Sequence, residues 1–185
     1  MITLVIGGAA CGKSAYAEAL CMQLDQDDDR EVVEGIAAEG CRESRKVYLA
    51  TMRPFGEEGA ARVRKHRAQR AGKGFTTIEC YESLANVVDD ERVNGSIALL
   101  EDLGNVVANE LFAEWEENTS LAHIVAIADR ADHLVIVGNE VGADGVSYPV
   151  ETVAYQQCLA ELTRALAKRC DRVVECCAGI PTVIK

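Results

Sequence analysis

The sequence predicts an α/β fold in which helices cover both faces of a mostly parallel sheet. Short apolar runs that suit buried strands alternate along the chain with longer segments of helical spacing, and this alternation is typical of parallel sheets. A glycine-rich segment at residues 7–12 joins the first apolar run directly to the first helical segment. A length of 185 residues suits one hydrophobic core, so we expect a single domain over residues 1–185.

The individual elements follow from the spacing of apolar residues. Strands are expected where short runs are rich in apolar or β-branched residues, at residues 2–6, 47–51, 75–79, 97–100, 133–137, 172–176 and 182–184. Helices are expected where apolar residues recur every three or four positions, at residues 13–24, 57–71, 82–88, 105–116, 121–131 and 151–169. Residues 179–182 are expected to form the turn before the last strand.

One stretch breaks this pattern, at about residues 25–46. It is rich in acidic and other charged side chains and poor in large apolar ones, so it adds little to a packed core. We predict a polar, mobile insertion here, with room for one short helix near residues 31–38.

Charge and cysteine usage exclude several classes of function. The chain has 19 basic and 30 acidic side chains and a net charge of −11, which repels nucleic acid, so none is expected as a partner. The eight cysteines include no C-x-x-C pair, and no secretory leader is visible, so we expect reduced thiols in a cytoplasmic protein. No apolar run approaches the roughly 20 residues that a membrane span needs.

The strongest chemical signal is Gly7-x-x-x-x-Gly12-Lys13-Ser14, which follows a predicted strand and opens a predicted helix. In a phosphate-binding loop of this pattern, or P-loop, glycines let backbone amides surround phosphate oxygens at a helix N-terminus. We expect Lys13 to reach the β- and γ-phosphates and the Ser14 hydroxyl to bind Mg²⁺. The alternative is a glycine-rich turn in another doubly wound fold, but the strand–loop–helix context favours a nucleotide-binding loop.

Polar side chains follow two of the other predicted strands. Glu101 and Asp102 come directly after the run at 97–100, and Asn139 and Glu140 follow the run at 133–137. The carboxyl ends of parallel strands face the crevice where such sheets bind ligands, so one acid is a candidate for a site near Mg²⁺. For Asp102 the alternative is a helix N-cap, since the next segment is helical.

His66 lies in a dense basic segment at residues 62–70. An unprotonated imidazole is a competent nucleophile toward phosphorus, and neighbouring guanidinium groups stabilise developing charge and lower the pKa of a histidine. The alternative is a solvated basic helix face. His123 and His133 lie in apolar stretches and are interpreted as ordinary surface or edge residues.

The chain resembles, nearly end to end, the bifunctional adenosylcobinamide kinase/adenosylcobinamide-phosphate guanylyltransferase family of cobalamin biosynthesis. Beyond the P-loop, the resemblance rests on a set of motifs and their order, namely Tyr48-Leu-Ala-Thr51-Met, Arg62-Val-x-x-His66-Arg-x-x-Arg70, Thr77-Ile-Glu79-Cys, Leu99-Leu-Glu101, Asn105-x-x-Ala-Asn109-Glu110-x-Phe112, Asn139-Glu140-Val-Gly142 and Gly179-Ile-Pro-x-x-x-Lys185.

The resemblance implies a P-loop enzyme with two activities that uses GTP and ATP as substrates and Mg²⁺ as cofactor. The kinase step phosphorylates the aminopropanol hydroxyl of adenosylcobinamide. The second step transfers GMP from GTP to adenosylcobinamide phosphate, giving adenosyl-GDP-cobinamide. The resemblance also implies that His66 carries the GMP, that Lys13 assists catalysis, and that the protein is a homo-oligomer, a trimer.

The same resemblance implies a set of ligand contacts. Nucleotide-binding residues are expected at Gly7, Gly8, Ala9, Ala10, Cys11, Gly12, Lys13, Ser14, Ala50, Thr51, Met52, Arg67, Ala68, Gln69, Arg70, Glu79 and Glu101. The expected Mg²⁺ ligands are Ser14 and Glu101.

Some residues depart from the family pattern. Gly138 stands where threonine is usual, and Ala160-Glu-Leu-Thr163 stands where Gly-x-x-Asn is usual. These changes lie away from the P-loop and His66, so a second hypothesis is an enzyme that retains guanylyl transfer alone. A third hypothesis is a regulatory protein that binds GTP without turnover, although such a protein has no use for a nucleophile at His66.

We predict that residues 26–44 contribute little to catalysis. Replacing them with a short Gly/Ser linker should leave the thermal midpoint and both activities close to those of the full chain, because loop-closure entropy changes slowly with loop length. A large loss of either activity in the shortened protein would contradict the interpretation of this segment as an insertion.

Overall fold

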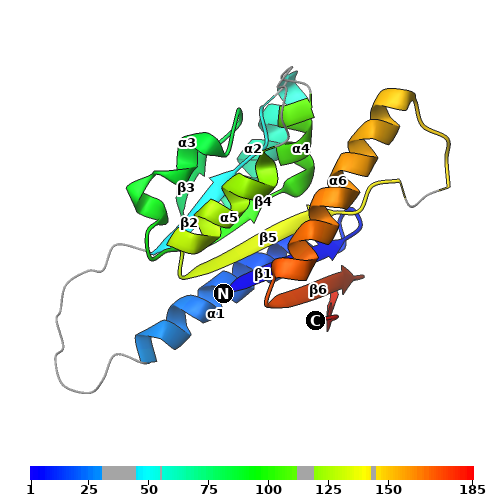
Figure 1. Cartoon of the computed structure of the whole chain (residues 1–185). Coiled ribbons are helices and arrows are strands. Elements are labelled where there is room, and N and C mark those ends of the chain that lie inside the picture. The colour runs from blue at the N-terminus through cyan, green and yellow to red at the C-terminus, as the bar shows by residue number, and fades with distance from the viewer. Residues whose placement is uncertain (31–44, 55, 112–118, 143–144) are drawn as a thin grey trace.

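The computed structural model describes residues 1–30, 45–54, 56–111, 119–142 and 145–185. Their strands form one sheet in the order β3-β2-β4-β5-β1-β6-β7 (Figure 1). All neighbouring pairs are parallel except β6 and β7, which confirms the predicted mostly parallel α/β fold. The strands are β1 (Ile2–Gly7), β2 (Lys46–Ala50), β3 (Thr76–Glu79), β4 (Ile97–Glu101), β5 (His133–Asn139), β6 (Arg172–Cys177) and β7 (Ile180–Val183).

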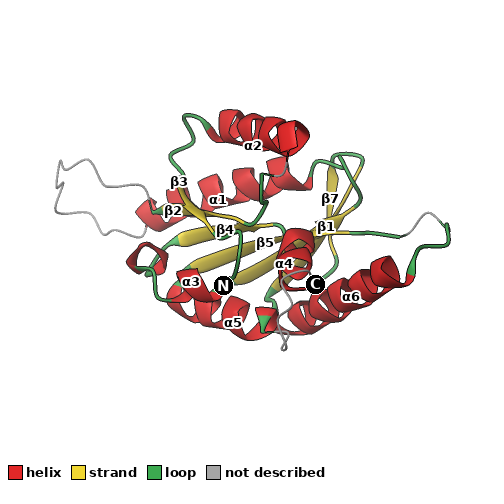
Figure 2. Ribbon diagram, turned by 90° about the horizontal axis from the view of Figure 1, so that it is seen from above, coloured by secondary structure: helices red, strands yellow, loops and turns green. Residues whose placement is uncertain are grey.

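Helices cover both faces of this sheet. Figure 2 shows α1 and α2 on one side and α3, α4, α5 and α6 on the other. None of the described helices combines the length and apolarity that crossing a membrane requires. The helices are α1 (Lys13–Arg30), α2 (Gly56–Arg70), α3 (Ala85–Val88), α4 (Leu103–Leu111), α5 (Ser120–Arg130) and α6 (Val150–Arg169), with a 3-10 turn, η1, at Glu91–Val93.

The core has two layers because side chains alternate between the faces of each buried strand. Val5 and Leu99 face α1 and pack with Leu20 of that helix. Leu4 and Leu100 face the other way and pack with side chains from α4, α5 and α6. All four strand residues are fully buried. Burial on both faces explains why these strands are apolar at nearly every position rather than at alternate ones.

The parallel register brings the carboxyl ends of the central strands to one edge of the sheet. Gly7 at the end of β1 lies opposite Asn139 of β5, and Glu101 at the end of β4 lies opposite Ala50 of β2. The loops that follow these residues therefore surround a single crevice, at the position where parallel sheets bind ligands.

The first helix is longer than predicted. α1 continues to Arg30 instead of ending near residue 24, so residues 25–30 of the predicted insertion are helical. The Asp25 carboxylate forms an ion pair with Lys46 at the start of β2, and this contact ties the extended part of the helix to the sheet. The rest of the predicted insertion, with its short helix near residues 31–38, lies outside the described residues.

The last hairpin is tighter than predicted. β7 begins at Ile180, so the prediction of a turn over residues 179–182 is wrong. The connection consists of Ala178 and Gly179, whose φ angles are 50° and 82°. Two consecutive positive φ angles match the twist of the flanking strands and close a two-residue hairpin, which leaves Cys177 paired directly with Ile180.

The start of α4 is set by a side-chain cap, whereas the N-cap residue of α3 makes no side-chain capping hydrogen bond. α4 begins at Leu103, earlier than predicted, because the Asp102 carboxylate accepts a hydrogen bond from the Asn105 amide at 2.8 Å. The Ser83 hydroxyl accepts from the Ala85 amide at 3.1 Å, and α3 follows it, later than the predicted start at residue 82. Residues 112–116 of the predicted helix lie outside the described part of the chain.

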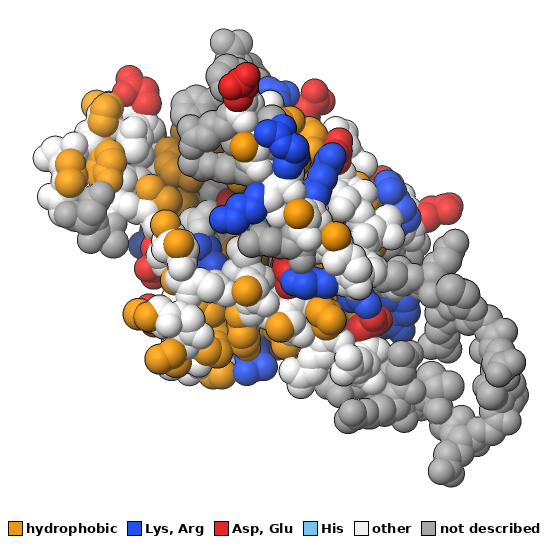
Figure 3. All heavy atoms as spheres, turned by 180° about the vertical axis from the view of Figure 1, so that it is seen from behind, with side chains coloured by type: hydrophobic (Ala, Val, Ile, Leu, Met, Phe, Trp, Pro, Cys, Tyr) orange, Lys and Arg blue, Asp and Glu red, His pale blue; other side chains and the backbone are white. Residues whose placement is uncertain are grey.

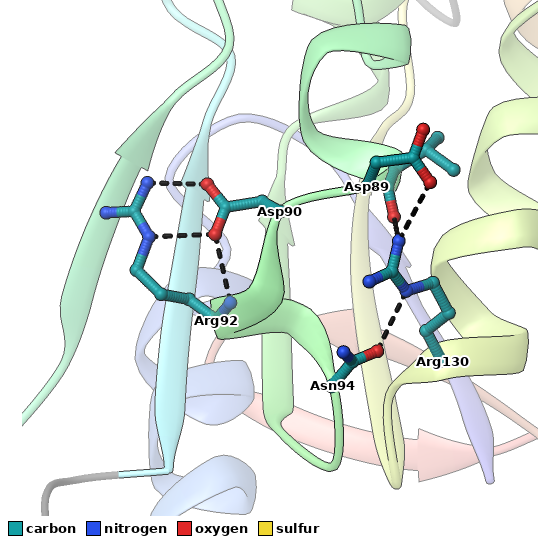
Figure 4. A network of polar contacts seen from close by, with 6 residues as sticks. Asp89, Asp90, Arg92, Asn94 and Arg130 are labelled. Atoms are coloured by element: carbon teal, nitrogen blue, oxygen red, sulfur yellow. Dashed lines mark hydrogen bonds and ion pairs between the residues drawn. The ribbon is translucent and has the colours of Figure 1, made fainter.

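Arg130, in the last turn of α5, joins three segments at the amino-terminal end of β4 (Figure 4). Its guanidinium donates to the Asn94 side chain at 2.8 Å, to the Asp89 carboxylate at 3.0 Å and to the Val88 carbonyl at the end of α3. Close by, Arg92 pairs with Asp90, two residues away in the sequence. Arg130 thus links distant parts of the chain, whereas Arg92 makes only a local pair.

We predict that Arg130→Met lowers the free energy of unfolding by about 1–2 kcal/mol, because it leaves the Val88 carbonyl without its charged donor. The matched control is Arg92→Met, which removes an exposed local ion pair and should change stability by less than about 0.5 kcal/mol. Urea denaturation followed by circular dichroism measures both. Equal destabilisation by the two variants would show that Arg130 has no special structural role.

Candidate functional site

The P-loop runs from the end of β1 into the first turn of α1, as predicted. Two of its glycines are required by close packing against the hairpin of β6 and β7. A Cβ atom on Gly7 would lie 2.4 Å from the carbonyl oxygen of Cys176, and one on Gly12 would lie 3.3 Å from the Cα of Gly179. The Gly179 amide donates to the Cys11 carbonyl at 2.9 Å. The hairpin therefore packs against the P-loop and supports its backbone. The sequence patterns did not reveal this role.

Lys13 is buried, with 6% of its surface exposed. Its side chain folds back along the loop, and its Nζ donates to the Gly8 carbonyl at 2.8 Å. This carbonyl is a neutral partner. The lysine charge consequently stays inside the loop and has no carboxylate hydrogen-bonded to it among the described residues.

The acid at the end of β4 meets the P-loop. Ser14 donates its hydroxyl hydrogen to Glu101 Oε1 at 2.5 Å, and Tyr48 donates to Glu101 Oε2 at 3.2 Å. Glu101 is 7% exposed, and both oxygens face the crevice side of the sheet. A serine hydroxyl and a carboxylate in contact are the hard oxygen donors that Mg²⁺ prefers.

Asp102 takes the capping role considered for it, and it also borders the crevice. It caps α4, and its side chain lines the same cavity as Lys13 and Asn139. Burial raises the pKa of its carboxyl group, while the Asn105 amide and the Asn139 side chain act in the opposite direction. Glu140, the other acid considered at a strand end, is exposed and does not line this cavity.

Thr51 does not line the cavity but has a structural role behind it. It is fully buried, and its hydroxyl donates to the Glu101 carbonyl and accepts from the Asp102 amide, each at 2.7 Å. The Asn109 side chain donates to the Thr51 carbonyl at 2.9 Å. Thr51 thereby fixes the backbone at the end of β4, which positions the two acids.

A cavity of about 280 Å³ joins the P-loop, the strand ends and α2. A second hollow on the other side of His66 is lined by residues 10–15 of the P-loop and by Lys65 and Lys73. His66 borders both. The predicted site residues that line the main cavity are Ala9, Ala10, Lys13, Ser14, Ala50, Met52, His66, Arg67, Arg70 and Glu101, and they are joined there by Tyr48, Val63, Thr77, Tyr81, Asp102, Asn105 and Asn139.

The other predicted nucleotide contacts lie around this cavity. Cys11 and Gly12 line the second hollow, and Glu79 lines a third one beside the end of α2. Gly7, Gly8 and Ala68 line none of the three hollows. The side chain of Gln69 lies outside the part that the structure describes.

α2 carries the basic side chains of the site. Lys and Arg side chains gather on the face seen from behind (Figure 3). On α2 itself, Arg64, Lys65 and Arg67 are exposed. Arg67 also lines the cavity and pairs with Glu79. Two adjacent residues of α2, His66 and Arg67, therefore both contribute to the cavity wall.

Two donor-capable nitrogens in the cavity wall lack a protein partner. His66 Nδ1 and Arg70 Nη1 are buried, and neither has a hydrogen-bond partner among the described residues. Because both residues line the cavity, these two nitrogens are available to a ligand with hydrogen-bonding oxygens. His123 and His133 lie on α5 and at the start of β5, outside the cavity.

Comparisons with known proteins point to one family. Residues 3–184 match the model of the family described as "Cobinamide kinase / cobinamide phosphate guanyltransferase". The "Bifunctional adenosylcobalamin biosynthesis protein CobU" of Salmonella typhimurium is 27% identical over 201 residues and 100% of both chains. CobP of Pseudomonas aeruginosa, with the same description, is 27% identical over 188 residues, covering 100% of this chain and 98% of its own length.

Among solved structures, the flagellar accessory protein FlaH of Methanocaldococcus jannaschii has a TM-score of 0.53 at 11% identity, covering 100% of this chain and 77% of that chain. Such a likeness shows the fold alone. The family match spans nearly every residue, and it includes the P-loop, Glu101 and His66, which the fold brings together at one edge of the sheet. The chain belongs to the cobinamide kinase/cobinamide phosphate guanyltransferase family.

Proposed function

We propose that this chain catalyses both steps named for its family, phosphorylating adenosylcobinamide and then transferring GMP from GTP to adenosylcobinamide phosphate through a GMP–His66 intermediate. One observation carries the second half of this proposal. His66 lies in the wall of the same cavity as the P-loop lysine, and its Nδ1 and the Nη1 of Arg70 are buried without partners among the described residues.

In the kinase step, the P-loop amides and Lys13 hold the triphosphate. Lys13 exchanges the Gly8 carbonyl for the more strongly accepting oxygens of the β- and γ-phosphates. The hydroxyl of the cobinamide side chain then attacks the γ-phosphorus and displaces the nucleoside diphosphate, so the new O–P bond forms as the bond to the diphosphate breaks, and the hydroxyl proton is released to solvent. Loop and lysine are in position before the substrate arrives, which lowers the entropy lost in reaching the transition state.

Ser14 and Glu101 fit an Mg²⁺ site. The described residues contain no cluster of three or more His, Cys, Asp or Glu side chains that suits a metal ion, and Mg²⁺ commonly uses one or two protein oxygens together with phosphates and water. When bound, Mg²⁺ would neutralise part of the charge on the transferring phosphates. Tyr48 donates a hydrogen bond to the second oxygen of Glu101, and Ser14 donates one to the first.

In the transferase step, the His66 imidazole attacks the α-phosphorus of GTP. A P–N bond forms, the bond to pyrophosphate breaks, and Arg70 and Lys13 offset the charge of the departing and transferred phosphates. A phosphate oxygen of adenosylcobinamide phosphate then displaces the histidine. Two displacements at one phosphorus predict net retention of configuration.

We also propose the remaining features that the family resemblance implies. Residues 1–185 act as one nucleotide-binding domain, GTP serves the transferase step, and ATP or GTP serves the kinase step. Glu79, which pairs with Arg67, accepts hydrogen bonds from the guanine base. The protein assembles as a homo-oligomer, a trimer, and works in the cytoplasm.

Lys13→Ala should abolish productive triphosphate binding and lower both activities by about a hundredfold or more, because each step loses charge stabilisation at the phosphates. The thermal midpoint should change little, since the lysine bonds only to a loop carbonyl. Lys168→Ala, at the exposed end of α6, is the matched control and should retain wild-type rates. Near-normal GTP turnover by folded Lys13→Ala would overturn the P-loop assignment.

His66→Ala should lose the covalent intermediate. Wild-type protein incubated with α-labelled GTP should acquire an acid-labile label and exchange pyrophosphate into GTP without corrinoid, because the first displacement is reversible. His66→Ala should do neither, yet should phosphorylate adenosylcobinamide at least in part, since γ-phosphoryl transfer needs no histidine adduct. His123→Ala controls for loss of a histidine elsewhere. Label that persists in His66→Ala, or that maps to Lys65, would falsify the assignment.

A further inference from the structure

Tyr48 occupies an unusual position for a residue in a buried strand. It is 4% exposed. The edge of its ring, its hydroxyl group and the face of its ring each contact a different residue. The ring meets Phe75 edge-on, with centroids 6.5 Å apart and planes at 85°. The hydroxyl donates to Glu101 Oε2 at 3.2 Å. The guanidinium carbon of Arg70 lies 3.3 Å from the ring centroid.

These contacts fix the ring before any ligand binds. Its neighbours Val47 and Leu49 point into the core on the opposite face of the sheet, so the strand itself directs Tyr48 toward α2. Phe75 and Glu101 then restrict rotation of the ring at its edge and tip. Arg70 lies on one face of the ring, which neither Phe75 nor Glu101 contacts.

Arg70 is held in a way that leaves a donor for a ligand. Only 7% of the residue is exposed, and its Nη1 has no hydrogen-bond partner among the described residues. A buried guanidinium is costly to desolvate, and an aromatic face offsets part of that cost without using any N–H group. Arg70 and His66 stand four residues apart on α2 and so share one face of the helix.

We propose that Tyr48 is a positioning residue for Arg70, with its ring serving as the platform that directs the guanidinium N–H edge toward the phosphate attacked by His66. The inference rests on the proposed transfer of GMP. It explains why the arginine is ordered although none of the described carboxylates pairs with it. A planar guanidinium can lie on a ring and donate from its edge at once, which the ammonium of lysine cannot do.

The test is a double-mutant cycle with Tyr48→Leu, Arg70→Met and the double variant. The rate of GMP incorporation at saturating GTP should fall about tenfold in Tyr48→Leu, the range expected for a desolvated cation–π contact, and further in Arg70→Met. The double variant should be no slower than Arg70→Met, because Tyr48 acts through that arginine. Tyr48→Phe keeps the aromatic face and should stay within about threefold of wild type.

A purely structural role for Tyr48 gives a different result. In that case the losses of the two single variants multiply in the double variant, and Tyr48→Phe offers no rescue. Either outcome overturns the proposal. If the thermal midpoint shows that Tyr48→Leu does not fold, the rate of GMP incorporation by Arg70→Lys tests the proposal instead. The platform requires about a tenfold loss in Arg70→Lys, whereas wild-type incorporation by that variant overturns it.

The same cycle, measured on the Kd for GTP by calorimetry, separates this inference from the proposed function. Absence of label on wild-type protein would contradict the GMP–histidine proposal alone. The binding cycle still decides the role of Tyr48, because GTP binding involves no covalent step. Non-additive losses of affinity would support the platform, and additive losses would overturn it.

Discussion

The parallel register of β1, β5 and β4 is the constraint on which the site depends. Ser14 and Glu101 are 87 residues apart in the sequence, and they meet because both follow strands that end at the same edge of the sheet. A shift of one residue in a β-strand turns every side chain to the opposite face. Because the strands are buried on both faces by differently shaped layers, such a shift would disrupt the whole core, so the core itself fixes where the P-loop meets Glu101.

The P-loop is supported by a part of the chain that comes much later in the sequence. The turn between β6 and β7 donates a hydrogen bond to the Cys11 carbonyl and approaches Gly12 within van der Waals contact. Gly8 differs, since a Cβ placed there would meet nothing within 4 Å. Gly7 and Gly12 are therefore needed for packing inside the protein, whereas the space around Gly8 is open. A loop held in this manner loses little conformational freedom when phosphate binds.

The sequence predicted those features that depend on local chemistry. The P-loop was identifiable because its glycines, lysine and serine lie within eight residues between a strand and a helix. The sheet was identifiable from continuous apolar runs such as residues 97–100. His66 was ambiguous on its own residues, because a basic helix face and a nucleophile among cations have the same local pattern. Its assignment as the GMP carrier came from the family resemblance and stays a proposal.

Features that depend on distant contacts were missed. The burial of Lys13 depends on how the loop folds back to the Gly8 carbonyl, and the length of α1 depends on Lys46, which comes after the predicted insertion. Tyr48 had no functional signal, since a tyrosine within an apolar run is typical of a strand core. Only the approach of α2 from above the sheet, which places Arg70 on the ring, distinguishes this tyrosine from its neighbours.

The charges of the site show how an acidic protein can hold a polyphosphate. With a net charge of −11, its long-range field opposes an anion, but that field is screened beyond about 8–10 Å at physiological salt. Nearer the ligand, the partners of each cation matter more. Lys13 donates a hydrogen bond to a carbonyl, and Arg70 lies on an aromatic ring. Both partners are neutral.

Phosphate can bind these two cations without displacing a carboxylate, whereas Arg67 must first share or leave Glu79. Because Lys13 and Arg70 are also buried, a low local dielectric strengthens their attraction for phosphate, and we infer that they dominate its binding.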